Sequence, residues 1–108
     1  MKKGEIWLAN LPQQIGKEQL GERPALVIAD TEVGLIIVIP LTSNLKLSKY
    51  QHTIKISPSK QNSLDKESIA PIFQLRAVDK KRMLYKIGNL ENHYLEEINK
   101  ALKNLLKL

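Results

Sequence analysis

At 108 residues, of which 43% are hydrophobic and 26% charged, the chain is expected to fold as one soluble globular domain with a single core. It contains no run of about 18 apolar residues and no apolar stretch behind its basic start, so we expect neither a membrane span nor secretion. The absence of cysteine excludes disulfides and thiolate metal sites, and it fits a cytoplasmic location.

The net charge of +6 is distributed unevenly along the chain. Residues 1–42 carry four bases and five acids, and residues 91–108 carry three of each. The excess therefore lies in residues 43–90, which carry ten bases and three acids. A concentrated positive charge favours a polyanionic partner such as nucleic acid, although lysines that only solubilise loops give the same pattern.

The first part of the sequence predicts three strands and one long loop. Residues 5–9 form a short apolar strand, and residues 10–22 are polar and rich in glycine and proline. A loop of this length in a compact domain is often functional. The apolar runs 25–29 and 35–41 are bounded by turn residues, which predicts a hairpin whose strands are buried on both faces.

The remainder alternates between short strands and turns, and it ends in a helix. The apolar residues between Leu90 and Leu106 recur at helical spacing, with acids early and lysines late, as the helix dipole favours. Together the pattern predicts a mainly β fold, five to seven short strands curled into a barrel, with a C-terminal amphipathic helix. The expected segments are a basic loop at 44–51, a half-exposed strand at 53–57, a turn-rich stretch at 58–66, a strand within 67–75, a helical turn at 78–83 and a strand at 84–90.

Two polar groups are predicted to meet at one edge of the sheet. Pro24 fixes φ and lacks a ladder donor, so it predicts a strand entrance just before residue 25. The residue before a proline is held extended, which directs Arg23 outward from the rim. Thr42 follows the neighbouring strand. A guanidinium beside a hydroxyl suits the binding of phosphate.

Six segments, in order and over nearly the whole length, carry a resemblance to a known family. They are KGEIW at 3–7, GKEQLGERP at 16–24, PLTS at 40–43, LDKES at 64–68, QLRAVDK at 74–80 and KIGNL at 86–90. With these segments the chain resembles the MazF/PemK family of toxins from bacterial type II toxin–antitoxin systems.

The resemblance implies an SH3-like barrel that forms a single domain over residues 1–108 and assembles as a homodimer. It implies an endoribonuclease that cuts single-stranded RNA at short sequences by attack of the ribose 2′-hydroxyl, without metal, cofactor or ribosome, and leaves a cyclic phosphate. The implied partners are the RNA substrate, a cognate antitoxin whose acidic C-terminal segment occupies the groove, and operator DNA only in complex with that antitoxin. No membrane partner is expected.

By position, the resemblance implies that Arg23 and Thr42 are catalytic. Arg23 would clamp the phosphate because a guanidinium stays charged at neutral pH, and Thr42 would donate a hydrogen bond. No cluster of side chains has metal-ligand spacing, and the general base is not identified, although His52 in the basic loop is a candidate. The residues implied to bind RNA are Gln19, Ser43, Asn44, Gln74 and Arg76.

Structural roles for the same residues remain open at this stage. Arg23 would otherwise pair with Glu18 or Glu22, and Thr42 would act as a strand-end cap. Two other functions also remain: a toxin of the same fold that acts on a protein target such as DNA gyrase, and a non-catalytic partner that binds operator DNA with an antitoxin. Cleavage of naked RNA in EDTA separates the nuclease from both alternatives.

Overall fold

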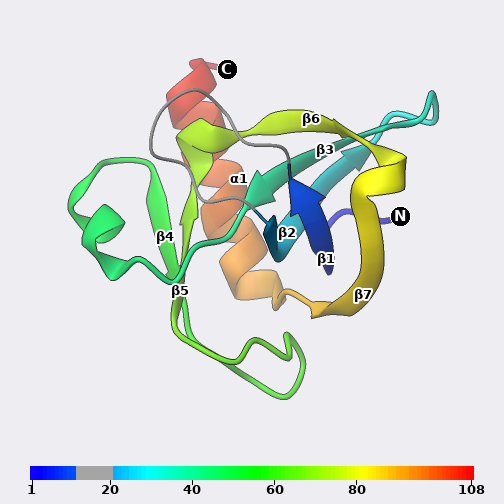
Figure 1. Cartoon of the computed structure of the whole chain (residues 1–108). Coiled ribbons are helices and arrows are strands. Elements are labelled where there is room, and N and C mark those ends of the chain that lie inside the picture. Colours follow the sequence, from blue (N-terminus) through cyan, green and yellow to red (C-terminus); the bar gives the residue numbers. More distant parts are fainter. Residues whose placement is uncertain (12–20) are drawn as a thin grey trace.

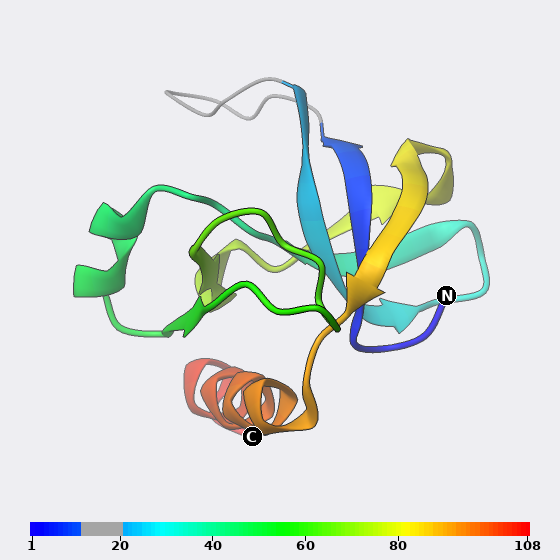
Figure 2. The same ribbon diagram turned by 90° about the horizontal axis from the view of Figure 1, so that it is seen from below.

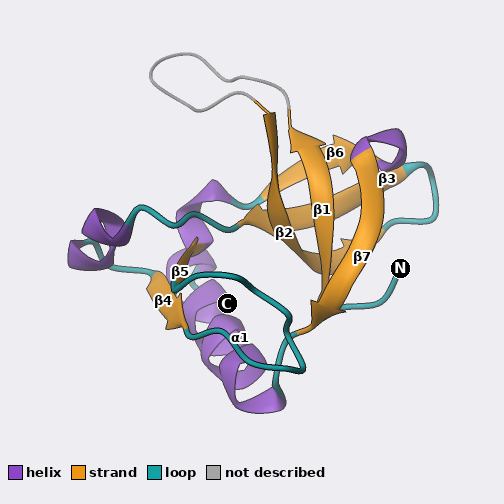
Figure 3. Ribbon diagram, turned by 60° about the horizontal axis from the view of Figure 1, so that its bottom comes forward, coloured by secondary structure: helices purple, strands orange, loops and turns teal. Residues whose placement is uncertain are grey.

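Five antiparallel strands form the main sheet of the protein. The computed structural model describes residues 1–11 and 21–108. The strand order is β6-β3-β2-β1-β7 (Figure 1). The strands are β1 (Glu5–Leu11), β2 (Gly21–Asp30), β3 (Leu35–Pro40), β6 (Arg76–Asp79) and β7 (Met83–Asn89). The edge strands β6 and β7 are joined by the 3₁₀ helix η3 (Lys80–Arg82), and the sheet curls towards a barrel (Figure 3).

A smaller sheet and the C-terminal helix pack beside the main sheet (Figure 2). The smaller sheet pairs β4 (Thr53–Ile56) with β5 (Ser68–Pro71), and helix α1 spans Asn92–Leu106. The seven strands and one α-helix of the described residues confirm the predicted mainly β fold with a C-terminal helix. No helix of the described part is long and apolar enough to span a bilayer. The other 3₁₀ helices are η1 (Leu45–Lys49) and η2 (Ile72–Gln74).

The central strands are buried on both faces, as their continuous apolar runs predict. Successive side chains of a strand point to opposite faces. On one face, Leu26 and Ile39 are fully buried against Ile98 of α1. On the other, Val27 and Val38 belong to a second buried cluster. Each such side chain contributes about 1.5–3 kcal/mol on burial, so the two clusters hold β2 and β3 rigidly between them.

The prediction that Pro24 marks a strand entrance is wrong. Strand β2 begins at Gly21, and Pro24 lies within it opposite Leu8 of β1. The carbonyl of Pro24 accepts the N–H of Leu41 at 2.9 Å, so the missing N–H of the proline faces the same side. Because β3 ends at Pro40, the N–H that the proline lacks could serve only the last pair of the hairpin, and the proline is tolerated inside the strand.

Two other segments differ from the prediction. The helical turn expected at 78–83 begins as strand β6, because Val78 is buried opposite Ile36 of β3, and only Lys80–Arg82 form a 3₁₀ turn. The side chain of Asp79 caps that turn by accepting the N–H of Lys81 at 2.9 Å. The basic loop at 44–51 contains the 3₁₀ helix η1.

The start of α1 is held by a buried side chain. Of the acids that the sequence places early in the helix, Glu91 stands at the N-cap, and none lies in the first turn. Glu91 lies just before the helix and accepts a hydrogen bond from Nδ2 of Asn62 at 3.1 Å. Asn62 is fully buried, and its Oδ1 accepts the N–H groups of Ser59 and Leu64 at 3.0 and 3.1 Å. This amide therefore fixes the turn-rich stretch 58–66 against the helix.

Candidate functional site

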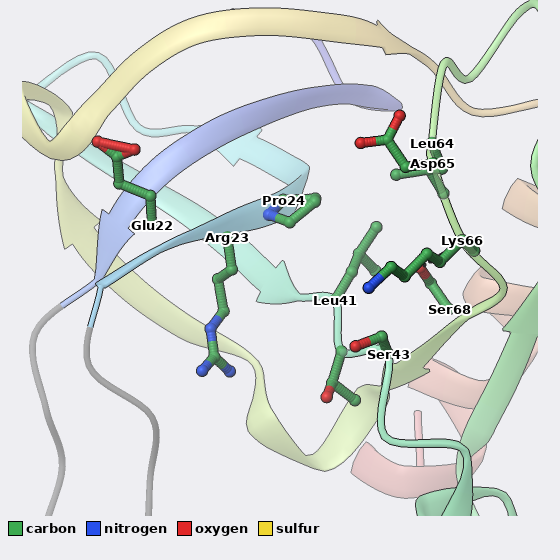
Figure 4. Close-up of a pocket in the computed structure, with 10 residues that line it drawn as sticks. Glu22, Arg23, Pro24, Leu41, Ser43, Leu64, Asp65, Lys66 and Ser68 are labelled. Atoms are coloured by element: carbon green, nitrogen blue, oxygen red, sulfur yellow. Dashed lines mark hydrogen bonds between the residues drawn. The ribbon is translucent and has the colours of Figure 1, made fainter.

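A cleft of about 250 Å³ opens where the start of β2 lies beside the end of β3 (Figure 4). Its walls come from β2, from the residues after β3, and from the segment that leads into β5. The hairpin and the turn-rich stretch are thus brought together by the fold, although they are far apart in the sequence. The described residues that line the cleft are Glu22, Arg23, Pro24, Leu41, Thr42, Ser43, Leu64, Asp65, Lys66 and Ser68.

Arg23 reaches the cleft from β2, where it stands opposite Ala9 of β1. Figure 4 shows Glu22 and Arg23 pointing to opposite sides of β2, as the alternation of a strand requires. These directions do not support a pair between Glu22 and Arg23, and Glu18 lies outside the described residues. The guanidinium presents several N–H donors in one plane, the geometry that matches a phosphate.

Thr42 is fixed by its backbone. Its N–H donates to the carbonyl of Ile69 at 3.0 Å, and its carbonyl accepts the N–H of Ile69 at 2.7 Å. This isolated bridge ties the end of β3 to β5. The Thr42 Oγ1 atom accepts the N–H of Asn44 at 3.1 Å, which uses one acceptor position and leaves the O–H proton to be donated. Thr42 therefore does stabilise a turn, and its hydroxyl also lines the cleft.

Arg23 and Thr42 are level with each other across the hairpin. The β2–β3 register pairs Ala25 with Pro40, and the bond from Leu41 to Pro24 continues it by one residue. The next step along the same register brings Arg23 opposite Thr42. Arg23 and Thr42 thus line the same cleft at this edge of the sheet, and their joint role at a phosphate stays a prediction.

Lys66 is a cleft residue that the sequence reasoning missed. Figure 4 shows its ammonium reaching into the cleft from the wall opposite Arg23. Lys66 lies in one of the segments that carry the family resemblance, LDKES at 64–68, and this was the available signal. From the sequence alone, a lysine in a turn-rich stretch is expected to be solvated surface. The structure shows that this stretch lies beside β2, so Lys66 lines the cleft.

The other predicted RNA-binding residues are placed differently. Ser43 lines the cleft, whereas Asn44, Gln74 and Arg76 are not among its described lining residues. The side chain of Asn44 instead caps η1 by accepting the N–H of Lys46 at 3.2 Å. Gln74 ends η2 and Arg76 stands opposite Val38 in β6. Gln19 lies outside the described residues.

The described lining residues include two carboxylates and no histidine. His52, the histidine considered as a base, precedes β4 with φ at 61° and is not among them. Within residues 1–11 and 21–108, no group of three or more His, Cys, Asp or Glu side chains lies close enough together to hold a metal ion.

The arrangement can bind one phosphate from two sides. Arg23 and Lys66 supply positive charge from opposite walls, and the hydroxyl of Thr42 supplies a further donor. Charge-assisted hydrogen bonds of this kind are about twice as strong as neutral ones. The apolar side chains of Pro24, Leu41 and Leu64 exclude water from part of the cleft, which strengthens the electrostatic attraction.

The chain resembles known toxins and endoribonucleases over nearly its whole length. The sequence model of the family described as "PemK-like, MazF-like toxin of type II toxin-antitoxin system" matches residues 2–106. The chain is 29% identical to Endoribonuclease EndoA of Bacillus subtilis, over 100% of its own length and 96% of that protein. It is 31% identical to Endoribonuclease MazF of Staphylococcus saprophyticus, over 94% of its own length and 88% of that protein. The crystal structure of MazF (Form-I) from Deinococcus radiodurans superimposes with a TM-score of 0.81 at 26% identity, covering 100% of this chain and 97% of that one.

Proposed function

Because the chain belongs to the PemK-like, MazF-like toxins of type II toxin–antitoxin systems, we propose that this endoribonuclease cuts single-stranded RNA in the cleft between Arg23 and Thr42. The ribose 2′-hydroxyl beside the scissile phosphate is the nucleophile, and the product is a cyclic phosphate. The reaction needs neither a metal nor the ribosome. The observation that carries the proposal is that Arg23, Thr42 and Lys66 line one cleft.

The chemistry asks little of the protein beyond positioning and charge. A bond forms between the 2′ oxygen and phosphorus, and the bond from phosphorus to the 5′ oxygen breaks. The proton of the 2′-hydroxyl passes to solvent water, and solvent supplies the proton that the leaving 5′ oxygen takes up. Because the nucleophile belongs to the substrate, holding it in line with the leaving group lowers much of the barrier.

Each cleft residue has a distinct part in this reaction. Arg23 binds two non-bridging oxygens with its planar fork, and Lys66 acts as a point charge from the opposite wall. The O–H of Thr42 donates to an oxygen on which negative charge grows as the bond to phosphorus forms. A single donor of this kind is worth about 10²–10³ in rate.

Two other functions would use the same fold differently. A toxin that acts on a protein such as DNA gyrase, or a non-catalytic partner that binds operator DNA with an antitoxin, has no need of a phosphodiester site. The two cations and the hydroxyl that line one cleft favour the nuclease. Both alternatives predict that the purified protein leaves RNA uncut.

Incubation with a long single-stranded RNA in EDTA, with the cut sites mapped, tests the proposal. We expect cleavage at defined short sequences and products that end in a cyclic phosphate. Arg23→Ala slows the cleavage by at least about 10²-fold, whereas Arg82→Ala, which removes an arginine outside the cleft, retains the rate. Intact RNA after incubation with the folded wild-type protein would exclude the proposal.

The proposed partners follow from membership of a toxin–antitoxin family. A cognate antitoxin inserts an acidic C-terminal segment into the cleft, where Arg23 and Lys66 attract its carboxylates. Operator DNA is bound only through the complex with that antitoxin. The proposed location of the protein is the cytoplasm, where its RNA substrate is found.

We propose a homodimer as the working form, and one apolar surface supports it. Tyr50 and Phe73 are 52% and 44% exposed, and their rings meet edge to face with centroids 6.5 Å apart. With Leu47 and Gln51 they line a shallow hollow of about 400 Å³. Exposed aromatic clusters of this kind are typical of protein interfaces. Light scattering after gel filtration should give twice the chain mass of 12.3 kDa, and Phe73→Glu should give the monomer.

A further inference from the structure

A second cleft, of about 400 Å³, adjoins the first on the other side of Pro24. The two clefts adjoin, since they share the lining residues Pro24, Leu64 and Asp65, and we refer to them together as the passage. Figure 4 shows Leu64 and Asp65 across the first cleft from Pro24. The remaining described residues of the second cleft are Leu8, Ser63, Tyr85, Lys86 and Ile87.

The floor of the passage is a straight row of side chains across neighbouring strands. Tyr85 of β7 stands directly opposite Leu8 of β1, and Leu8 stands opposite Pro24 of β2. Directly opposed residues of antiparallel strands share one face of the sheet. We call Tyr85, Leu8 and Pro24 the stacking row. It runs from the edge strand β7 to Pro24, which lines both clefts, whereas the side chain of the preceding residue, Arg23, points to the other face of β2.

The length of the row suits a short stretch of nucleic acid. Strands lie about 4.8 Å apart, so β7 is roughly 10 Å from β2. A stacked strand covers that distance in about three nucleotides at ~3.4 Å each, and an extended strand in fewer. A strand that also passes from one face of β2 to the other needs more than this minimum, so a nucleotide a few positions from the cut can reach Tyr85 while the scissile phosphate lies at Arg23.

The chemistry of the row suits a base and not a phosphate. Tyr85 is 59% exposed on the edge strand, and the half-buried Leu8 continues its apolar surface. Bases stack on exposed aromatic rings whatever their sequence. The carboxylate of Asp65 stands where the two clefts meet, and it repels a phosphate but accepts a hydrogen bond from the amino group of a base.

We propose that the stacking row is a second RNA subsite, in which a base flanking the cut stacks on Tyr85 while the scissile phosphate lies between Arg23 and Thr42. This inference rests on the proposed function, and it adds a determinant of affinity that the residues named from the sequence do not include. Nothing in the six segments of resemblance points to Tyr85, because the residue precedes the segment KIGNL at 86–90.

The test compares the binding of two RNAs by three proteins. Each RNA carries a mapped cut site with a 2′-deoxy nucleotide at the cut, which blocks attack; the longer RNA extends beyond the cut on both sides, and the shorter ends at the adjacent nucleotides. The proteins are the wild type, Tyr85→Ala and Leu84→Ala, the last being a control because Leu84 is 43% exposed and is not among the described lining residues of either cleft. Fluorescence anisotropy gives the dissociation constants.

We expect Tyr85→Ala to weaken binding of the longer RNA about tenfold and to leave the shorter RNA unaffected, since stacking on one aromatic ring is worth that much or more. Tyr85→Trp should retain the affinity, and Leu84→Ala should match the wild type. Equal affinity of Tyr85→Ala and wild type for the longer RNA, with RNA cleavage intact, would overturn the subsite and leave the proposed function standing. Loss of affinity for the cognate antitoxin alone would assign the row to a protein partner and also overturn it. If the wild type cuts no RNA, the proposed function fails, and the subsite fails with it.

Discussion

Leu41 donates its backbone N–H to the carbonyl of Pro24 at 2.9 Å, and this one bond extends the β2–β3 hairpin past the last residue of β3. It holds the following residue, Thr42, level with the residue before the proline, Arg23. The proline contributes in a second way, because it keeps Arg23 in an extended backbone conformation. The position of the two polar groups is therefore set by the backbone of the hairpin, before any substrate binds.

Removing the hydroxyl of Thr42 should impair cleavage more than folding. Thr42→Val keeps the shape of the side chain, so we expect the single-turnover cleavage rate to fall about 10²-fold. The bond from the N–H of Asn44 is also lost, which costs about 1 kcal/mol of stability. Thr42→Ser retains the hydroxyl and should keep most of the rate. A Thr42→Val variant that cuts RNA at the wild-type rate would remove Thr42 from the mechanism.

Lys66 should contribute to the binding of the phosphate although no sequence motif assigned it. Lys66→Met preserves the aliphatic part of the side chain and removes the charge, so we expect cleavage at low salt to fall about tenfold, with a weaker dependence on ionic strength. Lys60→Met removes an exposed lysine from the same turn-rich stretch, outside the described cleft, and serves as the control. Equal losses in the two variants would mean that only the general positive charge matters.

Asn62 should be the most sensitive polar residue of the turn-rich stretch. Asn62→Ala leaves the buried N–H of Leu64 and the partly buried N–H of Ser59 without their acceptor. Each unsatisfied buried group costs about 1–3 kcal/mol, and we expect a loss of stability within or above that range in urea unfolding. Asn104→Ala on the exposed side of α1 should change stability by less than about 0.5 kcal/mol. A stable Asn62→Ala variant would show that the stretch is held by other contacts.

Glu5 should make folding sensitive to acid. Its partial burial acts to raise the pKa of its carboxyl, but the hydrogen bonds from Trp7 and from the backbone, together with the charge of Lys86, outweigh burial and leave the pKa below its usual value of 4.5. A lowered carboxyl pKa contributes stability that is present above 4.5 and is lost as the pH falls through the folded-state value. Thermal unfolding of Glu5→Gln should therefore approach that of the wild type as the pH falls below about 4.5. A stability difference between the two proteins that is the same at pH 3 and pH 7 would contradict this.

The local part of the fold could be read from the sequence. The hairpin of β2 and β3, the short strand β4 and helix α1 are each marked by their own apolar pattern, and all are confirmed apart from a few terminal residues. The sequence does not predict strand β6. Its four residues, Arg76–Asp79, are followed by three bases, a pattern typical of a turn, and they form a strand because they pair with β3. The prediction for Pro24 also failed because it depends on a partner strand. A proline fits inside a strand where the neighbouring strand ends, and the end of β3 is not visible in the sequence around residue 24.

The site could be read from the sequence only where it lies within one hairpin. Arg23 lies in the first strand of the β2–β3 hairpin and Thr42 directly follows the second, so the pairing of these strands predicts that the two residues lie at the same edge of the sheet. Lys66 and Tyr85 come from segments that reach the clefts through long-range contacts. Lys66 lies in the segment LDKES at 64–68, but neither residue is placed beside β2 by a local pattern. The family resemblance implied RNA binding by Asn44, and the structure gives its side chain a capping role in η1.

A double-mutant cycle on Arg23 and Thr42, followed by single-turnover cleavage of one mapped site in EDTA, is the most direct test of a shared phosphodiester site. If both side chains bind the same phosphate, Arg23→Ala combined with Thr42→Val should cut only slightly more slowly than the slower single variant. If the two rate losses instead multiply in full, the residues act independently, and the cleft is not one catalytic site.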